Sequence, residues 1–350
     1  MNLPVSAPVD PMLARLARSL PTGELLYEPK WDGFRCLVFR DGDDLLLQSR
    51  NSKALDRYFP ELVDPDGPDP LRSQLPERVV LDGEIVVPID GRLDFDALAN
   101  RVHPARSRIH RLAAETPARY VAFDLLALGD EDLTAVAFSQ RRQRLEQALV
   151  GVHSPVHVTP ATTDVDVALD WFERFEGAGF DGVIAKPLGD GYAPGRRTLF
   201  KVKHERTADV VVAGFRWHRD GDGVGSLLLG LFDGDTLVPV GVASSFSRAR
   251  RAELIDELAP MRLDDVSAHP WNTDAAPRGA NRWTGGRDTS WEPLDCEQVA
   301  EVAYEQLTGN RFRHSARWRR WRDDRDPRSC RFDQLDVPVP SEIDQVFAEG

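Results

Sequence analysis

Five lysines stand out in this 350-residue sequence, because they are the only lysines among its 44 lysines and arginines. Arginine serves at almost every position that needs a positive charge, so a retained lysine is a candidate for chemistry that arginine cannot do. The guanidinium group stays protonated at working pH, whereas a lysine amine can lose its proton and act as a nucleophile. The five are Lys30, Lys53, Lys186, Lys201 and Lys203.

Four of these lysines lie in short motifs with polar residues at the ends of apolar stretches. Lys30 belongs to EPKWDGFR, Lys186 ends DGVIAK, and the segment FKVK holds Lys201 and Lys203. Lys53 has no such context, and we expect its side chain to be solvated. Motifs this far apart in sequence can meet where the strands of one sheet end.

Three further segments share this character. They are the SR pair ending at Arg50, LDGEIV with Glu84, and FDLL beginning at Phe123. Each is a weak signal alone, because a single KxDG or DGE has little specificity. Their joint occurrence, in order and at predicted strand ends, indicates one site.

The residue types in this set suit covalent phosphate chemistry. A lysine with an ordinary pKa of about 10.4 is neutral in only about one molecule in a few thousand at pH 7. Neighbouring cations and a divalent metal would lower that pKa. The candidate cations are Lys186, Lys201, Lys203 and Arg35. Glu84 and Asp181 carry hard oxygen ligands suited to Mg²⁺, and cations with such a metal stabilise charge on a transferring phosphate.

The overall charge argues against a nucleic-acid partner, and one local segment argues for it. The net charge is −13 and the pI about 5.1, but binding follows the local patch. Residues 311–322 hold six arginines and no acid, with Phe312, Trp318 and Trp321 interleaved. This segment is either a DNA-binding surface or a salt-bridged strand. The clusters at 106–111, 141–144 and 196–197 are further candidates for phosphate contact.

Several classes of protein are excluded by pattern. Cys36, Cys296 and Cys330 form no CxxC or zinc spacing, so we expect reduced thiols. There is no Walker A loop, HExxH or GxSxG motif, and we interpret 221–225 as a hairpin turn. No apolar run approaches about 18 residues and no signal peptide is apparent. We expect a cytoplasmic protein with no membrane partner.

The pattern of elements predicts an α+β chain of two domains. Residues 1–205 read as a domain with a substantial antiparallel sheet, and residues 206–350 as an OB-fold β-barrel of short strands with one inserted helix. The expected helices are 12–19, 139–150, 165–178 and 248–258. The expected strands are 35–40, 44–48, 78–87, 119–126, 209–215, 226–232, 236–243 and 299–306. A connection rich in Pro, Gly and Trp is expected over 269–293.

The six motifs, in their order, resemble those of a known superfamily. EPKWDGFR, SR, LDGEIV, FDLL, DGVIAK and FKVK are similar to the nucleotidyltransferase motifs of the ATP-dependent DNA ligases and mRNA capping enzymes. The segment EVAYEQLTGNRFRHSARWRRWRDDRDP resembles the last OB-fold strands and final motif of bacterial ligases. The resemblance covers residues 22–330 and is greatest to the small stand-alone actinobacterial ligases of type C. It implies a nucleotidyltransferase (ATP-grasp-like) domain before the OB-fold.

The resemblance also implies roles for individual residues. Lys30 would attack the α-phosphate of ATP and carry AMP covalently. The implied ATP-binding residues are Glu28, Arg35, Arg50, Glu84, Phe123, Lys186, Lys201, Lys203, Arg322 and Arg325, with Asp324 beside the last two. Glu84 and Asp181 would place a divalent metal, Mg²⁺ or Mn²⁺. The DNA contacts that we predict are Arg50, Arg311, Arg313 and Arg320.

Three positions depart from the family pattern. Asp181 stands where Glu is commoner, and its shorter reach would need a bridging water to a metal. Phe200 stands where Trp often precedes the first lysine of the pair. Arg325 stands where Lys is usual, which implies that only charge is needed there.

The implied function is ATP-dependent sealing of nicks in double-stranded DNA, with a role in DNA repair. We expect a monomer that works with a repair polymerase or nuclease. An RNA ligase or a GTP-using capping enzyme is the alternative within the superfamily, and the OB-region match argues against both. A catalytically idle nucleic-acid-binding protein is the alternative from another class, and intact Lys30, Glu84 and Lys186 argue against it.

Overall fold

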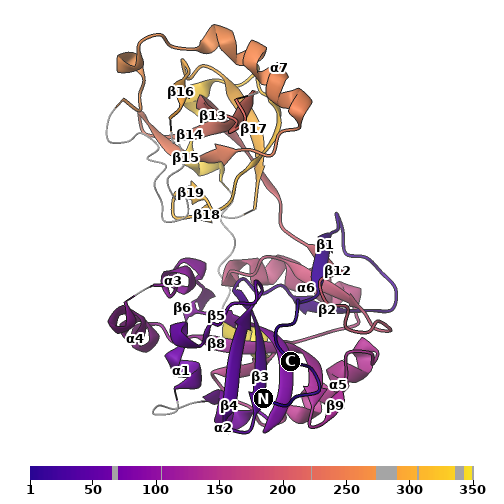
Figure 1. Ribbon diagram of the computed structural model, residues 1–350. Coiled ribbons are helices and arrows are strands. Elements are labelled where there is room, and N and C mark those ends of the chain that lie inside the picture. The colour runs from indigo at the N-terminus through magenta and orange to yellow at the C-terminus, as the bar shows by residue number, and fades with distance from the viewer. Residues whose placement is uncertain are drawn as a thin grey trace. The chain divides into compact units, whose positions relative to one another are not determined.

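The computed structural model describes residues 1–64, 70–103, 105–221, 223–272, 290–305, 307–335 and 343–348. The chain divides into two compact units, Met1–Lys203 with Pro338–Gly350 and His204–Val337. Each unit has sheets and an apolar core of its own (Figure 1).

The first unit is built on two sheets. The six-stranded sheet has the order β10-β8-β5-β3-β4 with β9 paired to β8, and the four-stranded sheet has the order β1-β12-β11-β2. The strands of the larger sheet are β3 (Phe34–Asp41), β4 (Asp44–Ser49), β5 (Arg78–Val86), β8 (Arg119–Leu128), β9 (Glu131–Asp132) and β10 (Val156–Val158). Those of the smaller sheet are β1 (Leu13–Leu16), β2 (Leu25–Pro29), β11 (Val183–Pro187) and β12 (Arg197–Val202). A separate hairpin joins β6 (Pro88–Ile89) and β7 (Arg92–Leu93).

The centre of the larger sheet follows from its sequence. The strands predicted at 35–40, 44–48, 78–87 and 119–126 are confirmed as β3, β4, β5 and β8, which lie side by side in Figure 1. β8 is apolar along most of its length, β5 carries Asp82 and Glu84 between two apolar stretches, and both strands are buried at almost every residue. Gly83 lets them approach, because a Cβ there would lie 2.5 Å from the carbonyl oxygen of Val121.

Helices pack against both sheets of the first unit. They are α1 (Pro60–Val63), α2 (Pro70–Gln74), α3 (Phe95–Asn100), α4 (Arg106–Glu115), α5 (Phe138–Ala148) and α6 (Val165–Arg174). The predicted helix at 139–150 is confirmed as α5. The predicted helix at 165–178 is confirmed as α6, which continues as a 3₁₀ turn over Phe175–Ala178. No helix in the described part of the chain is long and apolar enough to cross a membrane.

The prediction of a helix over residues 12–19 is wrong. Residues Leu13–Leu16 form β1, which pairs in parallel with β12. The apolar residues of this segment have helical spacing, but pairing with β12 and burial of Met12 outweigh that local preference. The residues before β1 also belong to the fold, since Leu3, Val5 and Val9 pack against the larger sheet.

The second unit is a mainly antiparallel sheet with the order β15-β14-β13-β17-β20 and with β16 paired to β13. Its strands are β13 (Arg206–Trp217), β14 (Val224–Asp233), β15 (Thr236–Ala243), β16 (Glu292–Pro293), β17 (Val299–Tyr304) and β20 (Arg317–Trp321), and a hairpin joins β18 (Leu307–Thr308) to β19 (Arg311–Phe312). The four strands predicted here are confirmed, and so is the turn at 221–225, which joins β13 to β14. The predicted helix at 248–258 is confirmed as α7 (Arg248–Leu258), whose N-cap Ser247 accepts a hydrogen bond from the Arg250 amide. Most of the predicted 269–293 connection lies outside the described residues.

The described ladders of the second unit do not close into a full barrel. β15 and β20 end the strand order and share no ladder within the described residues. One isolated bridge, Ala243 to Ala316, joins the two sides. The sheet is therefore an open form of the OB arrangement.

The C-terminal helix lies with the first unit, although the sequence placed residues 206–350 in the second domain. Helix α8 (Ile343–Ala348) buries Ile343 and Val346 in a cluster with Trp31, Trp171 and Phe175. Its short apolar pattern is compatible with any apolar surface, so the sequence did not indicate which unit it would cover.

Candidate active site

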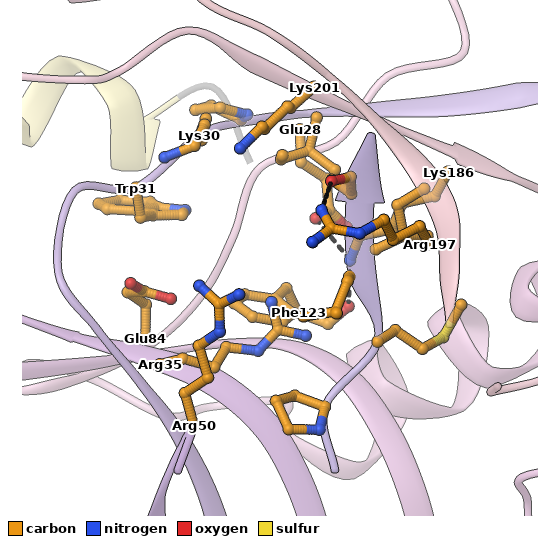
Figure 2. A pocket seen from close by; sticks show the side chains of 17 residues that line it. Glu28, Lys30, Trp31, Arg35, Arg50, Glu84, Phe123, Lys186, Arg197 and Lys201 are labelled. Carbon is orange, nitrogen blue, oxygen red and sulfur yellow. Dashed lines mark hydrogen bonds and ion pairs between the residues drawn. The ribbon is translucent and has the colours of Figure 1, made fainter. Parts of the chain in front are cut away.

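A cavity of about 190 Å³ lies in the first unit and gathers most of the predicted site residues. Lys30, Lys186 and Lys201 reach it from the smaller sheet, and Arg35, Glu84 and Phe123 from the larger one. Figure 2 shows Lys30 and Lys201 pointing into it from one side and Arg35, Arg50 and Glu84 from the other. The predicted residues in its lining are Glu28, Lys30, Arg35, Arg50, Glu84, Phe123, Lys186 and Lys201.

The position of Lys30 follows from the pairing of β2 with β11. Just beyond β2, the Lys30 amide donates to the Gly182 carbonyl at 2.8 Å, and its carbonyl accepts from the Asp181 amide at 3.0 Å. Gly182 has φ +126°, and a Cβ there would lie 1.9 Å from the Val202 carbonyl oxygen, so only glycine fits. The Lys30 side chain is one-fifth exposed, at 20%.

Two lysine amines converge on one carboxylate beside the cavity. Asp181 Oδ2 lies 2.6 Å from Lys30 Nζ and 2.9 Å from Lys203 Nζ. Burial would raise the pKa of Asp181, but the two ammonium groups outweigh it and hold that pKa below its usual range. The carboxylate is therefore ionised, and it orients the Lys30 amine.

Glu84 is the carboxylate that faces the cavity itself. It stands opposite Arg35 in the register of β3 and β5, and Figure 2 shows it near Trp31 at the wall. Burial raises its pKa to about 7, against the lowering effect of Arg35 and Lys30. Within the described residues, no hydrogen bond or ion pair engages its oxygens.

The resemblance implies a divalent metal, and these carboxylates fit such a metal only in part. Glu84 offers an unpaired oxygen in the cavity, and Mg²⁺ in nucleotide sites needs only one or two carboxylates besides phosphate oxygens. Asp181 is engaged by two lysines and does not line the cavity. No group of three or more His, Cys, Asp or Glu able to hold a metal occurs in the described ranges.

Arg35 is held in place by side chains to which the sequence analysis gave no role. Its Nε and Nη2 each donate to Asp82 at 2.5 Å, and Tyr192 Oη donates to the same carboxylate at 2.6 Å. Although burial opposes it, Asp82 raises the pKa of Arg35, which stays charged. The Arg35 guanidinium lies 4.3 Å from the ring centroid of Phe123. Asp82 and Glu84 are two residues apart in β5 and so lie on the same face of the strand. This spacing was the sequence signal that could have indicated a role for Asp82.

Glu28, one of the predicted ATP-binding residues, is buried among cations. Lys186 Nζ lies 2.7 Å from Glu28 Oε2 and donates to the Phe123 carbonyl at 3.0 Å. Arg142 lies 3.5 Å from the other Glu28 oxygen. Burial raises the pKa of Glu28 and lowers the pKa of Lys186 despite their attraction. The Lys186 amine also lies 4.6 Å from the Phe123 ring centroid.

The arginine cluster at 141–144 is not the phosphate-binding surface that the sequence suggested. Arg141 is buried and donates two hydrogen bonds to Asp124, at 2.8 and 3.0 Å. Arg142 is buried with Glu28, and Arg144 pairs with Glu131 at 2.7 Å. Buried charges need such partners, so these arginines hold α5 to the sheet.

The N-terminal segment forms part of the wall, which the sequence did not reveal. Pro11, Met12, Leu13 and Ala14 line the cavity. Exposed Arg197 donates to the Ala14 carbonyl at 3.4 Å, near the cavity mouth. Sequence reasoning missed this wall because it took these residues for a helix.

The arginine-rich segment of the second unit is a strand laced with ion pairs. Arg317 and Arg319 pair with Glu205, and Arg320 pairs with Glu301 at 2.8 Å. Arg320 is nevertheless 62% exposed, and Arg311 in β19 is also exposed. The salt-bridged arrangement thus coexists with a positively charged outer surface.

The residues of the second unit that were predicted to bind ATP, Arg322 and Arg325, also lie close to each other and to Asp324. Arg322 donates to Asp324 at 2.8 Å and to Asp209 at 3.0 Å. Arg325 Nε lies 3.6 Å from Asp209 Oδ2. Hydrogen bonding to Arg322 lowers the pKa of Asp324 to about 2.

Comparison with known proteins gives one consistent family. The model of the ATP dependent DNA ligase domain matches residues 11–203, and that of the ATP dependent DNA ligase C terminal region matches residues 220–325. The chain is 52% identical to DNA ligase C2 of Mycolicibacterium smegmatis, over 97% of this chain and 98% of the relative. It is 49% identical to DNA ligase C of Mycobacterium tuberculosis, over 99% of each.

A solved structure agrees with the fold. The chain matches a structure described as a Lig E DNA ligase with a TM-score of 0.57 and 17% identity, over 89% of this chain and 99% of that one. The match in sequence spans both units, and the cavity carries the nucleotidyltransferase motifs. The chain therefore belongs to the family of ATP-dependent DNA ligases.

Proposed function

We propose that this protein seals nicks in duplex DNA with ATP, and that Lys30 is its nucleophile. The observation that carries the proposal is the Lys30 amine at the wall of a cavity that also holds the side chains of Arg35, Lys186 and Lys201. Such a concentration of cations with a single open carboxylate suits a polyphosphate. The two-sheet wall with Phe123 suits a flat base beside it.

The first step forms a lysyl-AMP. Lys30 Nζ attacks the α-phosphorus of ATP, a nitrogen–phosphorus bond forms, and the bond to the bridging oxygen of pyrophosphate breaks. Starting from the ammonium, Lys30 gives up two protons, and pyrophosphate leaves with the bonding electron pair. The Asp181 carboxylate, 2.6 Å from the amine, orients the nucleophile.

The next two steps return Lys30 to its free form. The 5′-phosphate of the nick attacks the AMP phosphorus, which forms an anhydride and breaks the nitrogen–phosphorus bond, and Lys30 regains its protons. The 3′-hydroxyl then attacks the 5′-phosphorus, loses its proton, and displaces AMP as the phosphodiester forms. Each step is a displacement at phosphorus, so positioning and charge stabilisation supply most of the rate.

The remaining site residues have proposed roles that follow their places. Glu28 accepts from the adenine amino group and Phe123 stacks on the base, while Arg35 and Arg50 hold ribose and phosphate. Lys186, Lys201 and Lys203 contact the α-phosphate. Glu84 would hold Mg²⁺ or Mn²⁺, which would neutralise charge on the phosphates, and Asp181 would be a second ligand only if it were free of one of its two lysines.

The second unit has a proposed role in both substrates. We assign residues 1–205, with helix α8, to adenylation and residues 206–337 to the OB-fold, where Arg322 and Arg325 orient pyrophosphate. Arg311, Arg313 and Arg320, with Arg50 of the first domain, contact the phosphates of nicked DNA. The chain acts as a monomer in the cytoplasm, at the nucleoid, in DNA repair, and a polymerase or nuclease prepares the nick.

Covalent labelling tests the proposal directly. With α-labelled ATP and Mg²⁺ or Mn²⁺, we expect label on the wild type and none on Lys30→Ala, while Lys53→Ala labels normally as the matched control. Ligation is then compared on nicked DNA and on single-stranded RNA. Undiminished label on Lys30→Ala would contradict the proposal, and a preference for RNA would make the protein an RNA ligase.

A further inference from the structure

The C-terminal helix α8 packs on the residue that follows the nucleophile. Trp31 is 5% exposed and lines the cavity between Lys30 and Glu84 (Figure 2). Its ring stacks on Phe347 of α8, with centroids 5.2 Å apart and planes at 25°. Phe347 therefore supplies part of the packing that fixes this wall of the site.

Helix α8 is held in place by contacts on several sides. The Ile343 amide donates to the Gly91 carbonyl at 2.7 Å, and the Ile343 and Val346 side chains are buried. Asp344 pairs with Arg119 at 3.1 Å. The Phe347 ring also stacks on His157, with centroids 3.8 Å apart. The helix thus occupies a specific binding surface, formed by Gly91, Arg119, His157 and Trp31, which we call the α8 site.

The Trp31 side chain is fixed on its other sides as well. Its Nε1 donates to Thr159 Oγ1 at 2.8 Å, and its ring meets Phe180 edge-on at 4.6 Å. Lys30 and Trp31 share a peptide bond directly after β2 ends at Pro29. A shift of Trp31 would therefore move the Lys30 backbone, and displacement of a reacting group by about 1 Å can cost about a hundredfold in rate.

We infer that Phe347 is a positioning residue for the Lys30 nucleophile and acts through Trp31. The inference rests on the proposed function and adds to it a contribution from a segment outside the six nucleotidyltransferase motifs. It predicts that loss of the Phe347 ring slows the step in which Lys30 attacks, and spares steps in which Lys30 is not the nucleophile.

The full-length Phe347→Ala variant tests this prediction. In single-turnover labelling with ATP, we expect lysyl-AMP formation to slow by about tenfold, with the KM for ATP within about twofold of wild type. Sealing of a nick that already carries a 5′-adenylate should proceed at the wild-type rate, because no bond to Lys30 forms there. Phe347→Tyr keeps the ring and should restore the labelling rate.

Two further variants separate positioning from folding. Phe347→Leu keeps an apolar side chain at this position but removes the ring. We therefore expect a melting temperature near that of wild type and labelling as slow as that of Phe347→Ala. Asp344→Ala removes one ion pair of the same helix but keeps the Phe347 ring, so we expect it to slow labelling much less than Phe347→Ala does.

Three outcomes would overturn the inference. Wild-type labelling rates in both Phe347→Ala and Phe347→Leu would show that the ring is not needed. An equal loss in labelling and in sealing of the pre-adenylylated nick would show a general structural effect. A wild-type chain that takes up no label at all would overturn the proposed function, and with it this inference.

Discussion

Arg35 shows how one motif residue depends on residues outside the motifs. Two of its three guanidinium nitrogens, Nε and Nη2, donate to Asp82, which is fully buried. Tyr192 holds the same carboxylate from the segment that joins β11 to β12, and its hydroxyl accepts from the Met12 amide at 3.3 Å. A chain of contacts therefore runs from the N-terminal segment to the cation beside Phe123.

Removing the Tyr192 hydroxyl should weaken the contacts that orient Arg35 through Asp82. Tyr192→Phe leaves Asp82 without one donor in a buried site, which costs about 1–3 kcal/mol in unfolding free energy. We expect the KM for ATP in Lys30 labelling to rise by about three- to tenfold, since about 1 kcal/mol of orientation is lost. Chemical denaturation and initial labelling rates at varied ATP measure the two effects.

Tyr120→Phe is the matched control for Tyr192→Phe. Tyr120 is equally buried, but its hydroxyl reaches only the Cys36 carbonyl at 3.5 Å and does not touch Asp82. Its KM for ATP should equal that of wild type. An equal rise in KM for both variants would mean that the effect comes from loss of a buried hydroxyl in general.

At the residue scale, the sequence predicted the members of the site better than their partners. The motifs indicated Lys30, Glu84 and Lys186 because they lie at strand ends, but the sequence analysis placed those ends on one sheet, whereas the structure brings them together from two sheets. They did not indicate that Arg142 would reach Glu28, because a buried arginine on a helix looks like a surface arginine in sequence. Partners from distant elements follow from packing, which a local pattern does not contain.

At the scale of elements, long buried strands were predictable and terminal segments were not. β5 and β8 are long strands in which most residues are apolar, and Ser247 caps α7. β1 has four residues and α8 six, so each owes its conformation and place to the surface that it covers. Both nevertheless lie against the walls of the cavity.

The free energy of unfolding should depend on pH through His157, which packs against helix α8. Burial, together with Arg119, lowers the pKa of His157 to about 4, while Asp344 acts in the opposite direction. The folded state thus binds the proton less readily than the unfolded state, whose histidine has a pKa of about 6.5. Stability should be complete above pH 6.5 and fall by up to about 3 kcal/mol as the pH drops to 4.

The variant His157→Phe isolates this effect. It keeps a ring against Phe347 and removes the titrating group, so unfolding free energy should depend less on pH between 6.5 and 4. His153→Phe, an exposed position before the same strand, should keep the wild-type dependence. Denaturant titrations at several pH values measure both, and identical slopes for the His157→Phe variant and wild type would contradict the assignment.

At the scale of the whole molecule, the charge distribution determines how DNA is held. A chain with net charge −13 repels a polyanion at long range, so attraction must come from local surfaces. We propose the arginines of 311–322 as such a surface, although neighbouring acids such as Glu205 and Glu301 offset part of their charge. Binding should therefore depend on a small number of phosphate contacts.

Salt dependence measures that number. The binding constant K for duplex DNA falls as salt rises, and each phosphate contact makes the slope of log K against log salt more negative by about 0.9. The double variant Arg311→Ala, Arg320→Ala should thus make this slope less steep by about 2 for nicked DNA. It should leave Lys30 labelling unchanged. Arg219→Ala, a strongly exposed arginine beside the β13–β14 turn, is the control and should keep the wild-type slope. Equal slopes for the double variant and wild type would place the DNA contacts elsewhere on the chain.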